Sequence, residues 1–563
     1  MHALFFAILY IMEFLLALTA LAWLIPNHYS PWSSAWNEAV AILGLICVLP
    51  FVFLRCQEWR LSKILIILPI VFWVSIASQV ITGKLLFFGD GVIAAFYVAI
   101  WFASVMVGNY LFLYHPEKNG VDVLAIIWVF GSIFSVAIAL IQWTNVFSLG
   151  IYGVDFPPGA RPFGNVAQPN HLCTLSFMGL CGVVWLHQQR VLSKPGFWLT
   201  TIFLLIGMVL SQSRTGWLQI AWFGAFFIIF CDRIGLRLKR FEIGIVVVIF
   251  YCGALSLGKL SQWLMLSTSR SIADQMQADI RVPYWLAMVD AIGREPIWGY
   301  GWLQVGLAQQ TIALDHKNFG SLFEHSHNFI LDIFLWNGLI LGGIILILLI
   351  VWIWRLKISA LNNKVFWLAV ALGGIFIHGM LEFPLEYSYF LIPAGLAMGA
   401  IDAAGGKGGN AFLMPKKLCW ALFAILILVF TFLVKDYLRA EENYRQLRLE
   451  SARIGVDRLV TPAAKMQVLN QLEALLVFAR TEATPRMSSE ELNFMKAVSE
   501  RFGYPPVLFR YALAAGLNDQ PEISRNTLEK ICKIHEPERC KEAVEGWAVL
   551  VQQYPELEKI EFR

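Results

Sequence analysis

Long runs of apolar residues alternate with short polar segments along most of this chain. Many runs hold roughly 18 or more nearly uninterrupted apolar residues, which is enough to cross a bilayer as a helix. Lipid cannot satisfy backbone N–H and C=O groups, so such runs must form helices or a closed barrel, and continuous runs indicate helices. The pattern predicts about thirteen transmembrane helices, at residues 3–25, 39–54, 61–81, 89–113, 121–143, 171–186, 197–210, 216–231, 243–257, 329–354, 365–381, 385–401 and 418–434.

The overall composition agrees with this pattern. Of 563 residues, 58% are apolar and 15% are charged, and the mean hydropathy is +0.64, which is typical of a multi-pass membrane protein and not of a soluble enzyme. The first apolar run follows Met1 and His2 without a basic segment or a clear cleavage site, so we expect a retained helix and not a signal peptide.

The distribution of charge predicts the topology. With the N-terminus in the cytoplasm, the inner loops carry most of the lysines and arginines found between spans, although the outer loops are longer. Thirteen spans then place everything after Val434 outside. The sequence thus predicts a membrane domain, 1–434, with a large outer loop at about 258–328, and an outer C-terminal domain, 435–563.

Helical periodicity continues in both outer regions. Residues 280–293, IRVPYWLAMVDAIG, predict a helix lying against the membrane surface, followed by a glycine-aromatic turn at 296–302. The C-terminal region predicts paired amphipathic helices that resemble helical-hairpin repeats. Its acidic and basic residues nearly balance, which does not suggest nucleic-acid binding. Cys532 and Cys540 pair if this region faces an oxidising compartment, and otherwise remain two free thiols.

Polar residues gather on the predicted outer side, where any chemistry is expected. The chain has no Walker, Rossmann, C-x-x-C or H-E-x-x-H motif. The outer residues are Arg161, Asn165, Gln168, Asn170, His171, Arg214, Arg281, Glu324, His325, His327, His378, Glu382, Glu386, Tyr387 and Tyr389.

Arg161, Arg214 and Arg281 come from three separate segments. Each arginine alone can be explained by contact with lipid head groups, and GNVAQPN alone by an ordinary turn. Together the three arginines suit the binding of phosphate oxygens, because the guanidinium fork binds such groups in a bidentate manner. The hypothesis is a site for an anionic, phosphate-bearing, lipid-attached substrate.

His327 lies at the start of the span at 329–354, where Ser326 or Asn328 can cap the helix. The positive end of a helix disfavours imidazolium, so the ring stays neutral and can accept a proton. Capping alone is the structural alternative. A metal site in EHSH is a third reading, although His325 and His327 would not share a helix face.

Four stretches resemble bacterial O-antigen ligases and polymerases: RPFGNVAQPNH (161–171), SQSRTGW (211–217), RVPYWLAM…PIWGYGW (281–302) and HSHNFILDIFLWNGL (325–339). PNHYSPWSSAWNE (26–38) and HGMLEFPLEYSYFLIPAG (378–395) are similar, more narrowly, to protein O-oligosaccharyltransferases, the protein and pilin glycosylation ligases. The similarity spans roughly residues 20 to 400, and the helical tail resembles the extra domain of that branch.

The resemblance implies an all-helical membrane glycosyltransferase of the C type in the bacterial inner membrane, with its active site and C-terminal domain in the periplasm. It implies an oligosaccharide donor on undecaprenyl diphosphate, transfer en bloc to a serine or threonine of a protein such as pilin, and no metal or other cofactor. Inversion at the sugar carbon is expected from direct displacement.

The same resemblance implies roles for individual residues. His327, of the His-Asn pair with Asn328, matches the proposed base. Arg214 and Arg281 match arginines that hold the diphosphate, and Arg161 is a weaker third match. The supporting residues are Gln168, Asn170, Glu324, His325, Asn328 and Tyr387.

Other functions fit part of the sequence. The acceptor could be lipid A core, as in an O-antigen ligase, or a growing glycan, as in a polymerase. A transporter of lipid-linked sugars is a more distant alternative, because transporters place polar groups near the middle of the membrane and often contain repeats.

Overall fold

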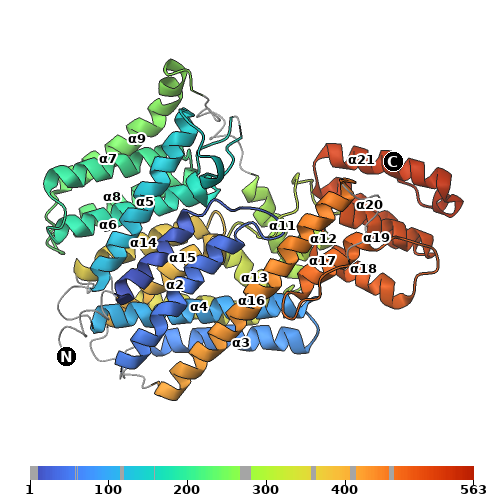
Figure 1. Cartoon of the computed structure of the whole chain (residues 1–563), viewed down its shortest axis with the longest axis horizontal. Coiled ribbons are helices and arrows are strands. Elements are labelled where there is room, and N and C mark those ends of the chain that lie inside the picture. The colour runs from blue at the N-terminus through green and yellow to red at the C-terminus, as the bar shows by residue number, and fades with distance from the viewer. Residues whose placement is uncertain are drawn as a thin grey trace. The chain divides into compact units, whose positions relative to one another are not determined.

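The computed structural model is all-helical through the residues that it describes (Figure 1). These residues are 11–56, 59, 61–114, 120–157, 159–266, 280–356, 363–405, 414–454 and 462–562. Residues 3–10 of the first predicted span lie outside them.

Among the described residues, nine helices are long and apolar enough to cross a membrane, so the chain is a multi-pass membrane protein. They are α2 (Ala35–Arg55), α3 (Lys63–Ile81), α4 (Phe88–Leu113), α5 (Gly120–Thr144), α6 (Pro169–Gln188), α9 (Arg240–Trp263), α13 (Phe329–Arg355), α15 (Ser388–Gly405) and α16 (Lys416–Ser451). Four shorter apolar helices are Ile11–Trp23, α7 (Lys194–Leu210), α8 (Arg214–Phe230) and α14 (Asn363–Gly379). Each of these helices overlaps one of the predicted runs, and the count of thirteen spans stays a prediction.

The helices divide into two compact units. Unit 1 contains residues 1–69, 97–278 and 349–428, and unit 2 contains residues 70–96, 279–348 and 429–563. The division falls within α3, α4, α13 and α16, so each of these helices contributes to both units.

Unit 1 is built around α6, which packs against α5, α7, α8 and α14. Its spanning window is 94% buried, as expected for a helix that is apolar on every side. Close packing elsewhere in this unit depends on small residues. A Cβ atom on Gly395 or Gly399 of α15 would collide with Ser104 or with the Val105 carbonyl of α4. This G-x-x-x-G pair lets the two helix backbones approach closely.

Unit 2 combines the large loop with the C-terminal helices. The loop contains α11 (Arg281–Arg294), at the position predicted from 280–293, and α12 (Val305–Ile312). The tail contains α17 (Asn470–Arg480), α18 (Ser489–Arg501), α19 (Pro505–Leu517), α20 (Pro521–Ile534) and α21 (Pro537–Gln553), which confirms the predicted series of tail helices. Cys532 and Cys540 form a disulfide, with Cα atoms 4.5 Å apart.

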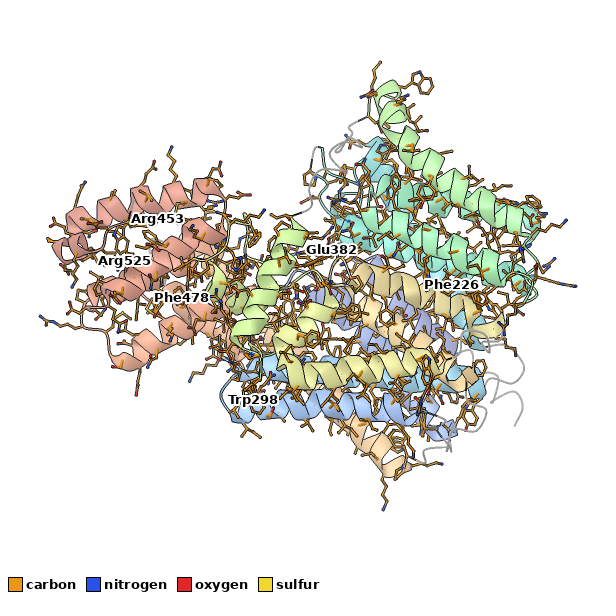
Figure 2. The ribbon with its side chains drawn as sticks, turned by 180° about the vertical axis from the view of Figure 1, so that it is seen from behind. Phe226, Trp298, Glu382, Arg453, Phe478 and Arg525 are labelled. Atoms are coloured by element: carbon orange, nitrogen blue, oxygen red, sulfur yellow. A yellow bond between two sulfur atoms is a disulfide. The ribbon has the colours of Figure 1, made fainter. Side chains whose placement is uncertain are left out.

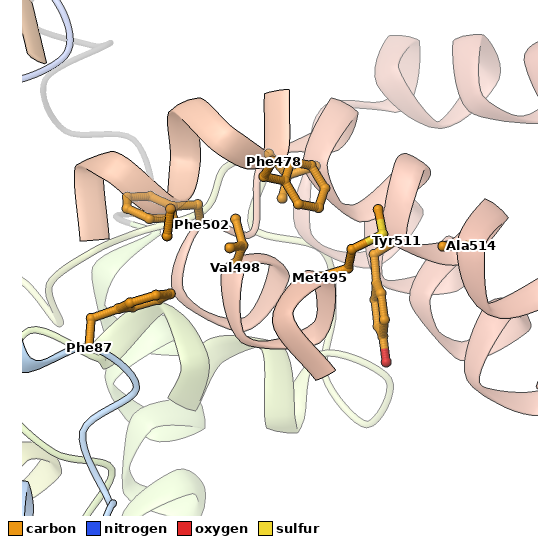
Figure 3. Packing of buried hydrophobic residues seen from close by; sticks show 9 residues of the cluster. Phe87, Phe478, Met495, Val498, Phe502, Tyr511 and Ala514 are labelled. Atoms are coloured by element: carbon orange, nitrogen blue, oxygen red, sulfur yellow. The ribbon is translucent and has the colours of Figure 1, made fainter. Parts of the chain in front are cut away.

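The tail helices enclose two apolar clusters. In the first, shown in Figure 3, Phe478, Met495, Val498 and Phe502 pack together with Phe87, which precedes α4. The second joins α19, α20 and α21 around residues such as Leu508, Leu528 and Trp547. Phe87 therefore ties a segment of the N-terminal half to the tail inside unit 2.

Two helices extend more than four residues beyond the predicted spans. α9 continues past residue 257 to Trp263, and α16 continues past Val434 to Ser451 without a break. Hydropathy locates only the apolar part of a helix, and backbone hydrogen bonds continue where the sequence becomes polar but keeps good helix formers. Asp436 in this polar extension accepts hydrogen bonds from the backbone N–H groups of residues 467–469, at 2.6–3.2 Å.

Candidate active site

The loop before α13 is held by several hydrogen bonds. The Asn328 side-chain oxygen accepts from the N–H groups of Ile330 and Leu331, at 3.1 and 3.4 Å, and so caps the helix. The backbone N–H of Ser326 donates to the Asp332 carboxylate at 2.8 Å. The Ser326 side chain is also bonded to the backbone of Asn328. The predicted cap is therefore present, and Asn328 provides it.

His327 lies directly before the capping residue, between these fixed positions. Its φ of 57° is in the left-handed region, which costs roughly 1–2 kcal/mol for a residue with a side chain. Such a conformation persists only where neighbouring contacts enforce it, and these often belong to functional sites. The ring is half-buried and meets Phe323 edge to face, with 5.2 Å between ring centroids. This arrangement presents the imidazole at the start of the helix, as the sequence predicts.

Glu324 begins this loop and contacts the tail. Its carboxylate accepts a hydrogen bond of 2.7 Å from the Tyr504 hydroxyl, which lies between α18 and α19. The surrounding protein acts to raise the pKa of Glu324, but the Arg501 charge, His325 and the Tyr504 hydrogen bond outweigh this effect and lower the pKa below its ordinary value. Glu324 is therefore a carboxylate at neutral pH.

A metal site at EHSH would require several ligating side chains close together. Across the part of the chain that the structure describes, no group of three or more histidine, cysteine or acidic side chains could hold a metal ion. His325 and His327 belong to a loop anchored by protein hydrogen bonds.

Arg281 is the first residue of α11, and this helix contacts the histidine loop. The indole N–H of Trp285, four residues later, donates to the Ser326 carbonyl at 3.0 Å. Residues four apart lie on the same face of a helix, so Arg281 and Trp285 share a face. Tyr284 and Met288 are buried and fix the helix against the rest of unit 2. The structure thus brings the helix that begins with Arg281 to the loop that carries His327.

The other two arginines meet at one turn of unit 1. The Arg161 guanidinium donates to the carbonyls of Ser211 and Gln212, at 3.4 Å each, in the turn that precedes Arg214. Arg214 is the first residue of α8 and is half-buried. Two cationic groups from separate loops therefore lie around a single helix start, where backbone N–H groups also favour anions.

Asn165 organises the loop that contains Arg161. Its side-chain amide donates to the carbonyls of Leu24 and Tyr152, at 2.8 and 2.9 Å. His28, from the N-terminal PNHYSPW segment, is bonded through Nε2 to the Asn165 carbonyl at 2.8 Å. Two stretches that carry the sequence resemblance are therefore in contact, although more than a hundred residues separate them.

Gln168 and Asn170 converge on Glu382, which is labelled in Figure 2 and lies in the turn between α14 and α15. Their amides donate to its two carboxylate oxygens, at 3.4 and 3.0 Å. His171, on the first turn of α6, packs edge to face against Tyr387, with 4.6 Å between centroids. Its Nδ1 is 3.3 Å from the Tyr389 hydroxyl. The predicted residues Gln168, Asn170 and Tyr387 thus lie among neighbouring polar side chains, of which Asn170, His171 and Glu382 are buried.

Several residues that contact the His327 loop or the Gln168–Asn170 segment are not predicted from the sequence. Asp332 and Trp285 were assigned no role, although they fix the histidine loop. The sequence places Glu382 among the outer polar residues but does not predict its bonds to Gln168 and Asn170, and the predicted site does not include Tyr504. An acidic residue inside or beside an apolar run is a signal for Asp332 and Glu382, because such residues are costly in a membrane. No local signal marks Tyr504, since its partner is 180 residues away.

Unit 1 therefore groups Arg161 with the start of α8, and Gln168 and Asn170 with Glu382. Unit 2 groups the Arg281 helix with the His327 loop and Glu324 with Tyr504. The chemistry available is an imidazole that can exchange a proton and guanidinium groups that can bind an anion.

Comparison with known proteins is consistent with this chemistry. Three family models match: "Virulence factor membrane-bound polymerase, C-terminal" at residues 366–547, "O-Antigen ligase" at 199–346 and "Protein glycosylation ligase" at 162–187. A general O-oligosaccharyltransferase of Acinetobacter baylyi is 27% identical over 543 residues, which cover 93% of each chain. A ComP-specific O-oligosaccharyltransferase of the same organism is 28% identical over 420 residues, covering 71% of this chain and 73% of that protein. These matches confirm the resemblance indicated by the sequence motifs.

Proposed function

We propose that this chain, a relative of the O-oligosaccharyltransferases with segments of the O-antigen ligase superfamily, is a glycosyltransferase for O-linked protein glycosylation. It transfers an oligosaccharide en bloc from undecaprenyl diphosphate to serine or threonine hydroxyls of proteins, with pilin as one candidate acceptor. The observation that carries the proposal is the hydrogen bond from Trp285 to Ser326, which joins the helix that begins with Arg281 to the His327 loop.

The proposed reaction is a direct displacement at the anomeric carbon. The acceptor hydroxyl oxygen forms the new bond to that carbon as its proton passes to His327. The bond from the carbon to the diphosphate oxygen breaks, and the electron pair leaves with the diphosphate. One displacement inverts the configuration at the sugar carbon.

The arginines act on the leaving group. Arg214 and Arg281, with Arg161 as a third, bind the diphosphate and stabilise the charge that develops on it. Diphosphate is already a good leaving group, so positioning and charge stabilisation are the main requirements, and no step in this scheme uses a metal. Gln168, Asn170 and Tyr387 have supporting roles in this scheme, and Glu324, His325 and Asn328 support His327.

We place the protein in the bacterial inner membrane with thirteen spans and a periplasmic active site. The positive charge of the inner loops supports this orientation. The Cys532–Cys540 disulfide supports an oxidising compartment for the tail, since disulfides persist in the periplasm and are rare in the cytoplasm. We also propose a glycosyltransferase fold of the C type, on the basis of the resemblance to the O-oligosaccharyltransferases.

We propose that residues 1–434 carry out glycan transfer and that residues 435–563 select the acceptor protein. Surfaces of stacked helical hairpins commonly bind extended partners. The tail is joined to the large loop within unit 2, which would bring a bound acceptor to the histidine.

A second function has support of its own. The family models described as O-antigen ligase and as membrane-bound polymerase match 199–346 and 366–547, so lipid A core or a growing glycan is the alternative acceptor. Transport of lipid-linked sugars is a more distant possibility.

The test is reconstitution of the purified protein with a lipid-linked oligosaccharide and three acceptors: a pilin-type protein, lipid A core and free glycan. We expect glycan on the protein alone, and added chelator should leave the rate unchanged. Transfer to lipid A core or chain extension would select the alternative function, and movement of the donor across vesicles without transfer would select transport. A clear loss of activity with chelator would contradict the metal-free mechanism.

A further inference from the structure

Tyr504 lies in the short connection between α18 and α19, residues 502–504, and every part of this connection is held in place. Arg501, the last residue of α18, donates to both carboxylate oxygens of Asp90, at 2.8 and 3.2 Å. Asp90 is fully buried and the Arg501 side chain is 12% exposed. A buried bidentate pair of this kind fixes direction as well as distance. The end of α18 is therefore anchored to the start of α4.

Phe502 and Gly503 are also fixed. Phe502 packs into the cluster that contains Phe87 (Figure 3). The Gly503 carbonyl lies 2.9 Å from Nε2 of His535, and a Cβ on Gly503 would lie 2.6 Å from the Gln310 amide. The Gln310 amide itself donates to the carbonyls of Ser499 and Glu500, at 3.3 and 2.9 Å. The Tyr504 hydroxyl consequently projects from a rigid base.

The partner of this hydroxyl is Glu324, three residues before His327. Ser326, between Glu324 and His327, is held by Asp332 and Trp285, and Asn328, on the other side of His327, caps the helix. The left-handed backbone conformation of His327 persists only if the residues on both sides are held, because the backbone would otherwise relax to a more favourable conformation. The Glu324–Tyr504 contact restrains the N-terminal side of this loop.

We infer that Tyr504 is a positioning residue for glycan transfer, and that it acts through Glu324 to hold the His327 loop in its reactive conformation. This inference rests on the proposed function, in which His327 is the base. It gives the tail a part in the transfer step itself, beyond the choice of acceptor. Arg501 and Asp90 contribute by fixing the helix end from which Tyr504 projects.

The pKa shifts of Arg501 and Tyr504 support a charged carboxylate at Glu324. Burial acts to lower the pKa of Arg501, but Asp90 and Glu324 outweigh it and raise the pKa above its ordinary value. Burial and the Glu324 charge together raise the pKa of the Tyr504 phenol. A neutral phenol that donates to a carboxylate forms a charge-assisted hydrogen bond, which is stronger than one between neutral groups.

The test compares Tyr504→Phe with Tyr554→Phe in the full-length protein. Both changes remove one tyrosine hydroxyl from the tail, and Tyr554 packs in the second apolar cluster, away from the first. We expect Tyr504→Phe to lower the transfer rate at saturating acceptor by about 10- to 100-fold, as for a misplacement of a reacting group of about 1 Å. Donor binding and thermal unfolding should match the parent, and Tyr554→Phe should transfer at the parent rate.

A second comparison separates positioning from a general loss of structure. In a His327→Ala background, Tyr504→Phe should cause no further fall in the residual rate, because there is no base left to position. Glu324→Ala removes the same contact from the exposed side and replaces the first variant if Tyr504→Phe fails to fold. Parent rates in both variants, or an equal fall with and without His327, would overturn the inference. Failure of the parent itself to glycosylate protein would instead reject the proposed function.

Discussion

The Asn170 amide donates a hydrogen bond of 3.0 Å to Glu382, and both residues are buried. Gln168 donates to the other oxygen of the same carboxylate at 3.4 Å. One acidic group thus orients two amides that the sequence places beside the proposed donor site. Removing the carboxylate leaves the buried Asn170 amide without this acceptor, which costs about 1–3 kcal/mol, whereas the half-buried Gln168 amide loses a longer and weaker bond.

Glu382→Ala is therefore expected to lower the stability of the protein and its transfer activity. Glu382→Gln keeps one carbonyl oxygen as an acceptor and should recover part of both losses. The measurements are thermal unfolding in detergent and glycan transfer to protein. Glu522→Ala, in the exposed first turn of α20, is the matched control and should behave as the parent. Full activity in Glu382→Ala would mean that the orientation of Gln168 and Asn170 is irrelevant to transfer.

Substitution of the arginines and of His327 should have different consequences. Arg214→Ala and Arg281→Ala should weaken donor binding and slow transfer, because the diphosphate is present before and during bond cleavage. Lysine should restore little, since it keeps the charge and loses the bidentate fork. His327→Ala should bind the donor normally and slow transfer by about 10²–10⁴-fold, the usual effect of losing a general base.

The measurement for these variants is donor binding beside protein glycosylation in one preparation. A folded His327→Ala protein that transfers at the parent rate would exclude His327 as the base. His325 would then be the next candidate, and capping of α13 would remain as the role of the loop.

The stability of the tail should fall in mild acid. Burial lowers the pKa of His535 below its usual 6.5, against the opposing effect of its hydrogen bond to Gly503, and Arg539 lowers it further. The folded tail thus favours the neutral ring, so its full contribution is present above pH 6.5 and is lost as the pH falls toward the lowered value. Hydrogen exchange of α19 and α20 should accelerate over this range. His535→Gln should flatten the dependence, and an unchanged profile in that variant would assign it to other groups.

Exchange of the tail should change the acceptor. Replacing residues 435–563 with the tail of the general O-oligosaccharyltransferase of Acinetobacter baylyi should alter which protein is modified and leave the glycan unchanged. The grafted tail must keep a tyrosine opposite Glu324 for transfer to proceed at the parent rate. Unaltered acceptor choice in an active chimera would limit the tail to stability and positioning.

The compartment of the tail can be tested with its cysteines. Thiol labelling of the denatured, unreduced protein should miss Cys532 and Cys540, which are bonded in the structure. A periplasmic alkaline phosphatase fused after Arg563 should be active. Labelling of both cysteines together with an inactive reporter would place the tail in the cytoplasm and remove one span from the proposed thirteen.

The apolar runs determined the positions of the membrane helices, because hydropathy and helical length are local properties of the chain. The tail helices were also predictable from local periodicity, as was the cap at Asn328, which depends on neighbours within three residues. The end of α16 was not predictable from local periodicity, because a helix continues through polar residues when tertiary contacts such as those of Asp436 support it.

The unusual residues can be identified from local sequence alone, because they are arginines and a histidine at the ends of apolar runs, where charge is costly. The partners of such polar residues, in contrast, are known only from the folded chain. Glu382 meets Asn170 across 212 residues and Tyr504 meets Glu324 across 180, and no local pattern encodes such contacts. The left-handed backbone of His327 also depends on the tertiary structure, because Trp285 and Tyr504 hold the residues before it, while the local cap at Asn328 holds the residue after it.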